Sequence, residues 1–106
     1  MDEALTLRQR IMELLRECEH PLTVDEIIAM LGIDVRPREV YNHLEHIAKT
    51  VRRLSKNTEV LLMKPPTCRR CGYVFKDIKK PRKPSRCPKC RSEWIEPPAF
   101  KIARAK

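Results

Sequence analysis

Four cysteines in two closely spaced pairs have the clearest chemistry in this chain. Cys68 and Cys71 form one C-x2-C unit, and Cys87 and Cys90 form a second after fifteen intervening residues. Two residues between cysteines let both sulfurs of a tight turn face one ion, so two such turns supply four soft ligands in a tetrahedron. The spacing therefore predicts one bound metal ion. Zinc is favoured over iron, although an S4 site accepts either metal.

A complete set of four thiolates predicts a structural role for this metal. Zinc catalysis needs an open coordination position, and four cysteines leave none. A redox dithiol and a pair of disulfides are the alternatives. Disulfides suit secreted proteins, and the N-terminus shows neither a basic segment nor an apolar signal core.

The other potential metal ligands have simpler explanations. The fifth cysteine, Cys18, lies on the apolar stripe of a predicted helix, where a small buried hydrophobe is expected. The histidines are His20, His43 and His46, and the last two are one helical turn apart. Because four cysteines complete the metal site, we expect surface or base-contacting roles for the histidines.

The positive charge of the chain is concentrated in the cysteine-rich segment. The chain carries 23 Lys and Arg against 14 Asp and Glu, a formal net charge of +9. Residues 1–66 hold 10 basic and 11 acidic side chains, a net of −1, whereas residues 67–106 hold 13 and 3, a net of +10. Such a basic region is typical of a nucleic-acid surface, and a segment that only aids solubility is the alternative.

Apolar periodicity and capping signals predict three helices in the N-terminal part of the chain. Thr6 with Gln9 and Thr23 with Glu26 form capping boxes at the starts of the first two helices. Gly32 suits the left-handed position just past the second helix. The predicted helices span residues 7–18 and 24–31, and the third begins at residue 37, where proline suits the first helical position.

The third predicted helix has one apolar and one polar face. Val40, Leu44, Ile47 and Val51 recur at spacings of four, three and four residues and make a core stripe. Glu45 lies on the opposite face and favours the alternative that this face is only a solvated surface. Five other side chains on that face are suited to nucleic-acid contacts: Arg38, Asn42, His46, Lys49 and Arg53.

Two strands, at residues 59–64 and 99–104, are predicted to pair on either side of the cysteine segment. Pro65-Pro66 and Pro97-Pro98 bracket that segment, and proline cannot donate to a sheet ladder. We therefore expect the metal unit to be inserted at the tip of the hairpin. The predicted parts are a helical domain with the first strand (1–66), a metal ribbon (67–96) and the returning strand (97–106).

The metal ribbon is too small to fold on apolar burial alone. About forty residues bury too little surface to offset chain entropy, so metal binding would supply the difference, on the order of 10 kcal/mol. Tyr73, Phe75 and Trp94 are expected to pack around the metal turns. A basic loop between the two cysteine pairs would track a nucleic-acid backbone or enter a minor groove, through Lys79, Lys80, Arg82, Lys83 and Arg86.

The order of three helices followed by a strand pair is that of a winged helix. The segments LTVDEIIAMLGIDVRPREVYNHLEHIAKTVRR, CRRCGYVF and CPKCRSEWI resemble archaeal predicted transcriptional regulators that join a winged helix-turn-helix to a rubredoxin-like zinc ribbon. The resemblance covers essentially the whole chain and implies an α+β fold whose wing is extended by the ribbon. Arg91 departs from the pattern, because such knuckles usually carry glycine there.

These features predict a DNA-binding transcriptional regulator whose third helix enters the major groove. Arg38 would read guanine and Asn42 adenine. The alternative is a protein- or RNA-interaction module of the transcription machinery that uses the basic ribbon. An iron protein for electron transfer is a third possibility, although the spacing between the knuckles is shorter than in electron-transfer rubredoxins.

Several classes of protein are not expected. The chain has no run of eighteen apolar residues, so no membrane span is predicted, and we expect a cytoplasmic protein. With two glycines it has no phosphate-cradling loop, and no nucleophile elbow or open metal site indicates an enzyme. The sequence does not settle the oligomeric state.

Overall fold

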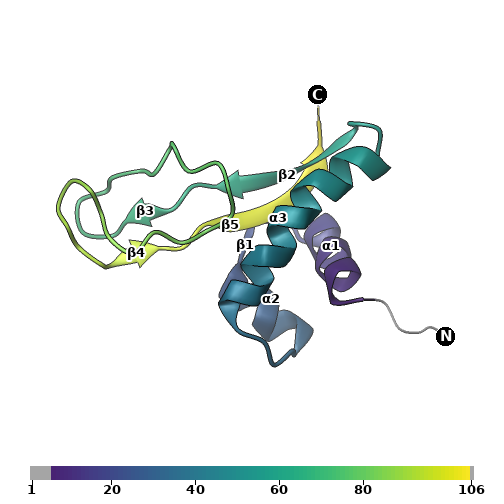
Figure 1. The fold of residues 1–106 in the computed structure, drawn as a ribbon, viewed down its shortest axis with the longest axis horizontal. Coiled ribbons are helices and arrows are strands. Elements are labelled where there is room, and N and C mark those ends of the chain that lie inside the picture. The colour runs from purple at the N-terminus through teal and green to yellow at the C-terminus, as the bar shows by residue number, and fades with distance from the viewer. Residues whose placement is uncertain (1–5, 106) are drawn as a thin grey trace.

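The computed structural model describes residues 6–105, which form three helices and five short or medium strands in an α+β fold (Figure 1). The predicted second helix and both predicted strands have the bounds expected from the sequence, and the first helix ends one residue earlier. The elements in chain order are α1 (Leu7–Glu17), β1 (Leu22–Thr23), α2 (Val24–Leu31), α3 (Pro37–Leu54), β2 (Glu59–Lys64), β3 (Thr67–Cys68), β4 (Ile95–Glu96) and β5 (Ala99–Arg104).

The first two helices begin with the predicted capping boxes. The Thr6 hydroxyl accepts from the backbone N–H of Gln9, whose side chain accepts from the Thr6 N–H in return. Thr23 and Glu26 make the same reciprocal pair at the start of α2. Gly32 closes α2 at φ +63°, a left-handed conformation that glycine adopts at little cost. These local signals therefore set the bounds of the two helices.

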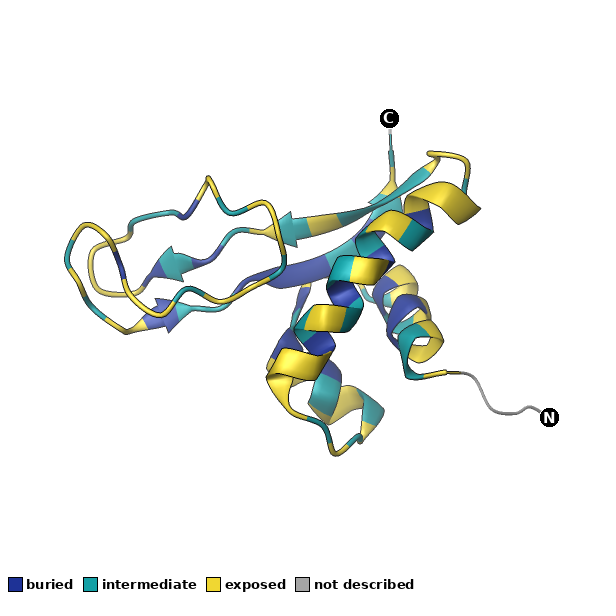
Figure 2. Ribbon diagram, viewed as in Figure 1, coloured by how far each residue is buried: buried dark blue, intermediate teal, exposed yellow. Residues whose placement is uncertain are grey.

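The main core lies between the three helices and one face of the sheet, as the dark blue segments of Figure 2 show. The predicted stripe of α3 is fully buried in it, and Phe100 of β5 is the largest fully buried side chain. The buried members are Ile11, Met12, Leu15, Leu22, Val24, Ile27, Val40, Leu44, Ile47, Val51, Phe100 and Ile102. None of them comes from residues 67–96, so this core is built without the metal ribbon.

The main sheet is antiparallel, with strand order β1-β5-β2. β2 pairs with β5 from Glu59 opposite Arg104 to Lys64 opposite Ala99, so the predicted strand pair is confirmed. β1 adds two residues to the other side of β5. This pairing brings the C-terminal strand into the middle of the sheet and makes β2 an edge strand.

The cysteine segment leaves the sheet at the ends of β2 and β5 and forms a second, two-stranded sheet of β3 and β4 (Figure 1). Pro66 and Pro98 are buried where the chain leaves and re-enters the main sheet. Cys18 is half-buried at the margin of the core rather than fully buried as expected, because its position at the C-cap of α1 is open to solvent on one side. No helix in residues 6–105 has the length and apolarity needed to cross a lipid bilayer.

Candidate metal centre and nucleic-acid surface

Two matching turns position the four cysteines. In the first, the backbone N–H of Gly72 donates to the Cys68 carbonyl at 2.9 Å, and in the second the N–H of Arg91 donates to the Cys87 carbonyl at 2.8 Å. Each turn is closed by a left-handed residue, Gly72 at φ +81° and Arg91 at φ +62°. Arg91 thus adopts the conformation for which glycine is usual, at some cost in strain.

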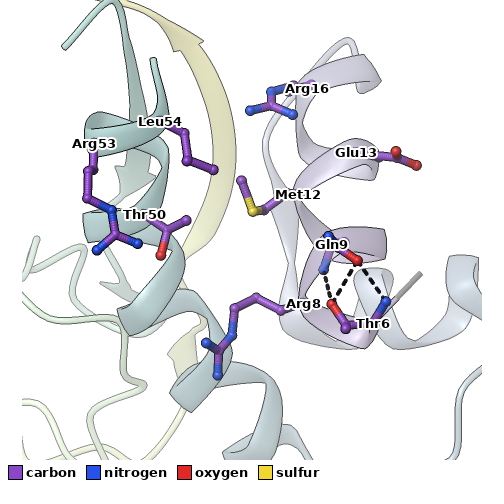
Figure 3. A pocket seen from close by; sticks show the side chains of 9 residues that line it. All are labelled: Thr6, Arg8, Gln9, Met12, Glu13, Arg16, Thr50, Arg53 and Leu54. Carbon is purple, nitrogen blue, oxygen red and sulfur yellow. Dashed lines mark hydrogen bonds between the residues drawn. The ribbon is translucent and has the colours of Figure 1, made fainter. Parts of the chain in front are cut away.

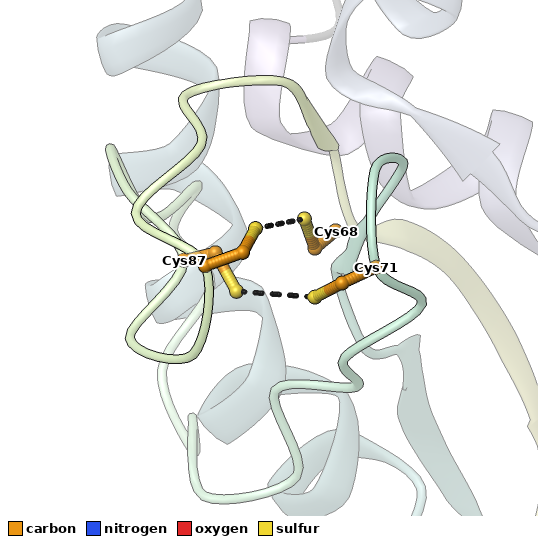
Figure 4. A group of neighbouring side chains, drawn as sticks. Cys68, Cys71 and Cys87 are labelled. Atoms are coloured by element: carbon orange, nitrogen blue, oxygen red, sulfur yellow. Dashed lines mark hydrogen bonds between the residues drawn. The ribbon is translucent and has the colours of Figure 1, made fainter.

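The four sulfurs lie within 4.8 Å of one another (Figure 4). The Sγ atoms of Cys68 and Cys90 are 3.5 Å apart, and those of Cys71 and Cys87 are 3.6 Å apart. A tetrahedron with zinc–sulfur bonds of about 2.3 Å has sulfur–sulfur edges of about 3.8 Å. These separations are too long for disulfide bonds, which measure about 2.05 Å. The donor set and its spacing therefore fit one tetrahedral zinc ion.

The backbone of each turn favours thiolate at its first cysteine. Burial raises the pKa of the Cys68 thiol, but the N–H groups of Cys71 and Arg70, together with the neighbouring Cys90 and Cys71 sulfurs, lower the pKa to about 6. At Cys87 burial again raises the pKa, and the N–H groups of Cys90 and Lys89, with the Cys71 and Cys90 sulfurs, lower it, so that the pKa is below its usual value.

The second cysteine of the first turn behaves differently. An N–H of Tyr73 lowers the pKa of Cys71, but burial and the neighbouring sulfurs raise it to about 11. Like charges at these distances disfavour four thiolates without a cation. A divalent cation at the centre of the cluster removes this conflict, because it favours ionisation of all four thiols.

A small apolar core backs the metal turns. Its buried members are Cys68, Phe75, Cys87 and Ile95, and the Tyr73 ring packs edge-on against Phe75 with ring centres 5.1 Å apart. The expectation that Trp94 belongs to this core is wrong, because its side chain is 61% exposed. In β4, Ile95 pairs with Cys68 and points inward, so strand alternation turns the preceding side chain outward.

All ten side chains predicted to contact nucleic acid are exposed. The structure brings part of the basic loop to the exposed side of α3. Lys80 Nζ lies 3.5 Å from Glu45 Oε2, so the acidic residue in the middle of that face pairs with a loop cation. Arg86 does not join this contact, because it pairs with Glu93 of the ribbon at 3.7 Å.

Lys83 of the same loop lines a hollow beside the N-terminal ends of α2 and α3. Asp25, Pro37, Tyr41 and Pro97 line it as well. Burial and the Asp25 carboxylate raise the pKa of Tyr41 to about 12, so its hydroxyl stays protonated. The loop therefore follows one flank of α3: Lys83 lies beside the start of the helix and Lys80 lies beside its middle.

Two arginines from α1 lie close to α3 and were not among the predicted contact residues. A groove of ≈ 430 Å³ lies between α1 and α3, and Arg8, Arg16 and Arg53 are among the residues that line it (Figure 3). Arg8 also donates from Nε to Nδ1 of His43 at 3.3 Å. Helical spacing could have placed Arg8 and Arg16 on one side of α1, but no sequence signal shows which helix that side faces.

The chain matches two family descriptions. Residues 6–61 match "PF0610-like, N-terminal", and residues 65–105 match "PF0610 rubredoxin-like zinc beta-ribbon domain". The solution NMR structure of protein PF0610 from Pyrococcus furiosus is similar to this chain, with a TM-score of 0.74 and 35% identity over 99% of this chain and 98% of the other. No curated protein sequence matches. The chain therefore belongs to the PF0610-like family and carries that family's rubredoxin-like zinc ribbon.

Proposed function

We propose that this protein is a DNA-binding transcriptional regulator of the winged-helix type, with a structural zinc ion in its wing. Apart from the inserted ribbon strands β3 and β4, the element order is α1-β1-α2-α3-β2-β5, which supports the interpretation as a winged helix. In this interpretation α2 and α3 are the helix-turn-helix, and the β2–β5 pair is the base of the wing. The exposed face of α3 carries Arg38, Asn42, His46 and Lys49. A helix of this width fits the major groove of B-DNA.

The contact between Lys80 and Glu45 carries the proposal, because it places the basic loop beside α3. An exposed ion pair is worth only about 0–1 kcal/mol, so it indicates where the loop lies rather than what holds it there. The pair also offsets the negative charge that argued against a nucleic-acid face. With α3 in the major groove, the adjacent DNA backbone would lie under Lys79, Arg82 and Lys83, which would contact its phosphates.

A salt titration of the zinc-loaded protein tests this role. We expect the affinity for a selected duplex, followed by fluorescence anisotropy, to fall steeply as salt rises. The slope of log K against log salt should be about −0.9 for each phosphate contacted. A weak affinity that does not depend on salt would refute the proposal.

Single charge removals sharpen the same test. Lys49→Gln on α3 and Arg82→Gln on the loop should each reduce the salt slope by about one unit. Arg104→Gln is the matched control, since Arg104 is exposed at the end of β5 and belongs to neither predicted set. If the control reduced the salt slope as much as the other two variants, binding would depend only on the total charge of the protein. That result would contradict a defined contact surface.

The exposure of Trp94 favours a second function, RNA binding by the ribbon. It lines a hollow with Arg69 and Lys83, and aromatic side chains beside cations stack on unpaired bases. The carboxylates of Asp25, Glu26 and Glu96 line the same hollow, and Glu96 pairs with Arg69 at 3.4 Å, so stacking on Trp94 rather than charge would have to carry this binding. Trp94 is the only tryptophan of the chain, so its fluorescence reports on this site alone. Quenching by single-stranded RNA with no response to duplex DNA would favour this function over the first.

We also propose that the metal is zinc and has no catalytic role. Four thiolates would fill its tetrahedral shell and leave no position for a substrate or water. A colourless protein with one equivalent of zinc after expression in metal-balanced medium is expected. A red protein that binds iron under those conditions would instead support electron transfer.

A further inference from the structure

The edge strand β2 pairs with β5 on one side, and within residues 6–105 no strand pairs with its other side, where the centre of β2 is apolar. Val60, Leu61, Leu62 and Met63 form its middle, and Leu62 is 49% exposed. Exposed edges are templates for pairing with another strand, and monomeric proteins protect them with central charges, proline or bulges. The charged residues of β2 stand only at its ends. This edge therefore lacks the usual protection in the four positions where a partner strand would pair.

Strand alternation shows which backbone groups of β2 are free. Thr58 accepts from the Ala105 N–H, so the hydrogen-bonded pairs with β5 continue at Val60, Leu62 and Lys64. The N–H and C=O groups of Leu61 and Met63 therefore point away from β5. Within residues 6–105, no hydrogen bond to these four groups is present.

The free stretch has a sharp boundary on each side. The N–H of Glu59 also points away from β5, but it donates to the Ser55 hydroxyl at 2.9 Å. On the other side, Pro65 follows the strand and has no N–H. The edge thus offers two donors and two acceptors, on Leu61 and Met63, symmetrically placed about Leu62.

We propose that two copies of this chain associate through antiparallel pairing of their β2 edges, with the two-fold axis at Leu62. In this register Leu61 of each copy pairs with the partner copy's Met63 through both N–H···O=C bonds, and Leu62 faces its own counterpart. A strand pairs with itself in this way only about a two-fold axis, which makes the interface isologous. A register centred on Leu61 would need the Glu59 N–H that Ser55 already occupies.

The side chains on the outer face of the sheet would pack without a clash of like charges in this register. The two Leu62 side chains would meet as a non-hydrogen-bonded pair, whose Cβ atoms approach to about 4.5–5.5 Å. Lys64 would lie across from the partner copy's Val60 and could cover it with its aliphatic stem. The pairing is short, and each copy is strongly basic, with a formal net charge of +9 from its Lys, Arg, Asp and Glu side chains. We therefore expect a weak dimer that becomes stronger as salt screens the repulsion.

Sedimentation equilibrium of the zinc-loaded protein, from about 20 µM to about 1 mM, tests the association. The average mass should rise from 12.5 kDa towards twice that value, and more so at higher salt. Leu62→Lys should abolish the rise while far-UV circular dichroism and zinc content stay unchanged. Leu54→Lys is the matched control, because Leu54 is 65% exposed and lines the groove between α3 and α1 rather than the β2 edge. A mass of 12.5 kDa at all concentrations would overturn the proposal.

Amide hydrogen exchange separates strand pairing from unspecific hydrophobic contact. Raising the protein concentration should slow exchange at Leu61 and Met63 at least several-fold, and leave Leu62 unchanged because its N–H already bonds to β5. Edge pairing would be refuted by a mass increase without slower exchange at Leu61 and Met63. It would also be refuted if Leu54→Lys abolished the mass increase as fully as Leu62→Lys. Neither measurement depends on nucleic-acid binding, so this inference can fail while the proposed function stands.

Discussion

Removing the metal should unfold the ribbon and leave the helical core intact. The main core contains no residue from 67–96, so its packing does not depend on the ribbon. Of the four buried residues behind the metal turns, two are ligands and only Phe75 and Ile95 are ordinary apolar side chains. Burying these two contributes about 3–6 kcal/mol in total. Metal binding to a structural site contributes more, about 10–16 kcal/mol.

Two-dimensional amide NMR with and without a zinc chelator, under reducing conditions, measures this difference. Signals of Phe75 and Ile95 should collapse to random-coil shifts, whereas those of Ile11 and Leu44 should stay dispersed. Cys87→Ser should act like the chelator, and Cys18→Ser should leave the spectrum folded. A ribbon that keeps dispersed signals without metal would refute the reasoning, as would collapse of the whole spectrum.

Three further predictions concern single residues. Burial and then Arg8 lower the pKa of His43, so at mildly acidic pH the unfolded chain binds more protons than the folded chain. The free energy of unfolding should therefore fall as the pH drops below about 6.5. Urea titrations at several pH values should show that His43→Gln weakens this dependence. Phe100→Ala should lower the free energy of unfolding by about 3–5 kcal/mol at an unchanged denaturant slope; a loss under about 1 kcal/mol would contradict its place in the core. Arg91→Gly should relieve a left-handed strain of about 1 kcal/mol and slow zinc loss to a chelator, whereas faster loss would show that this strain is absent.

Local signals in the sequence predicted the elements whose bounds depend on local chemistry. The capping boxes at Thr6 and Thr23 and the glycine at position 32 set helix ends through neighbouring backbone groups. The stripe of α3 emerged from periodicity, because burial of one helix face repeats every three or four residues. The convergence of four cysteines followed from ligand spacing, which the metal itself dictates.

Features that depend on contacts between distant segments were missed. β1 has two residues, too few for a recognisable pattern, and forms only because β5 offers it a partner. The place of the basic loop beside α3 depends on Lys80 meeting Glu45, a contact 35 positions apart that no local pattern encodes. Trp94 was misplaced because aromatic character indicates burial, whereas strand alternation at Ile95 decides which neighbour turns inward.

Mapping the contact surface by amide NMR is the most direct measurement of the central claim that α3 and the basic loop form one nucleic-acid surface. Titration of the zinc-loaded protein with a selected duplex should shift signals between residues 38 and 53 on the exposed side of α3 together with those of residues 79–86. Signals on the outer face of the sheet, such as Ala103, should stay in place. Shifts confined to the ribbon, or none at all, would contradict the claim.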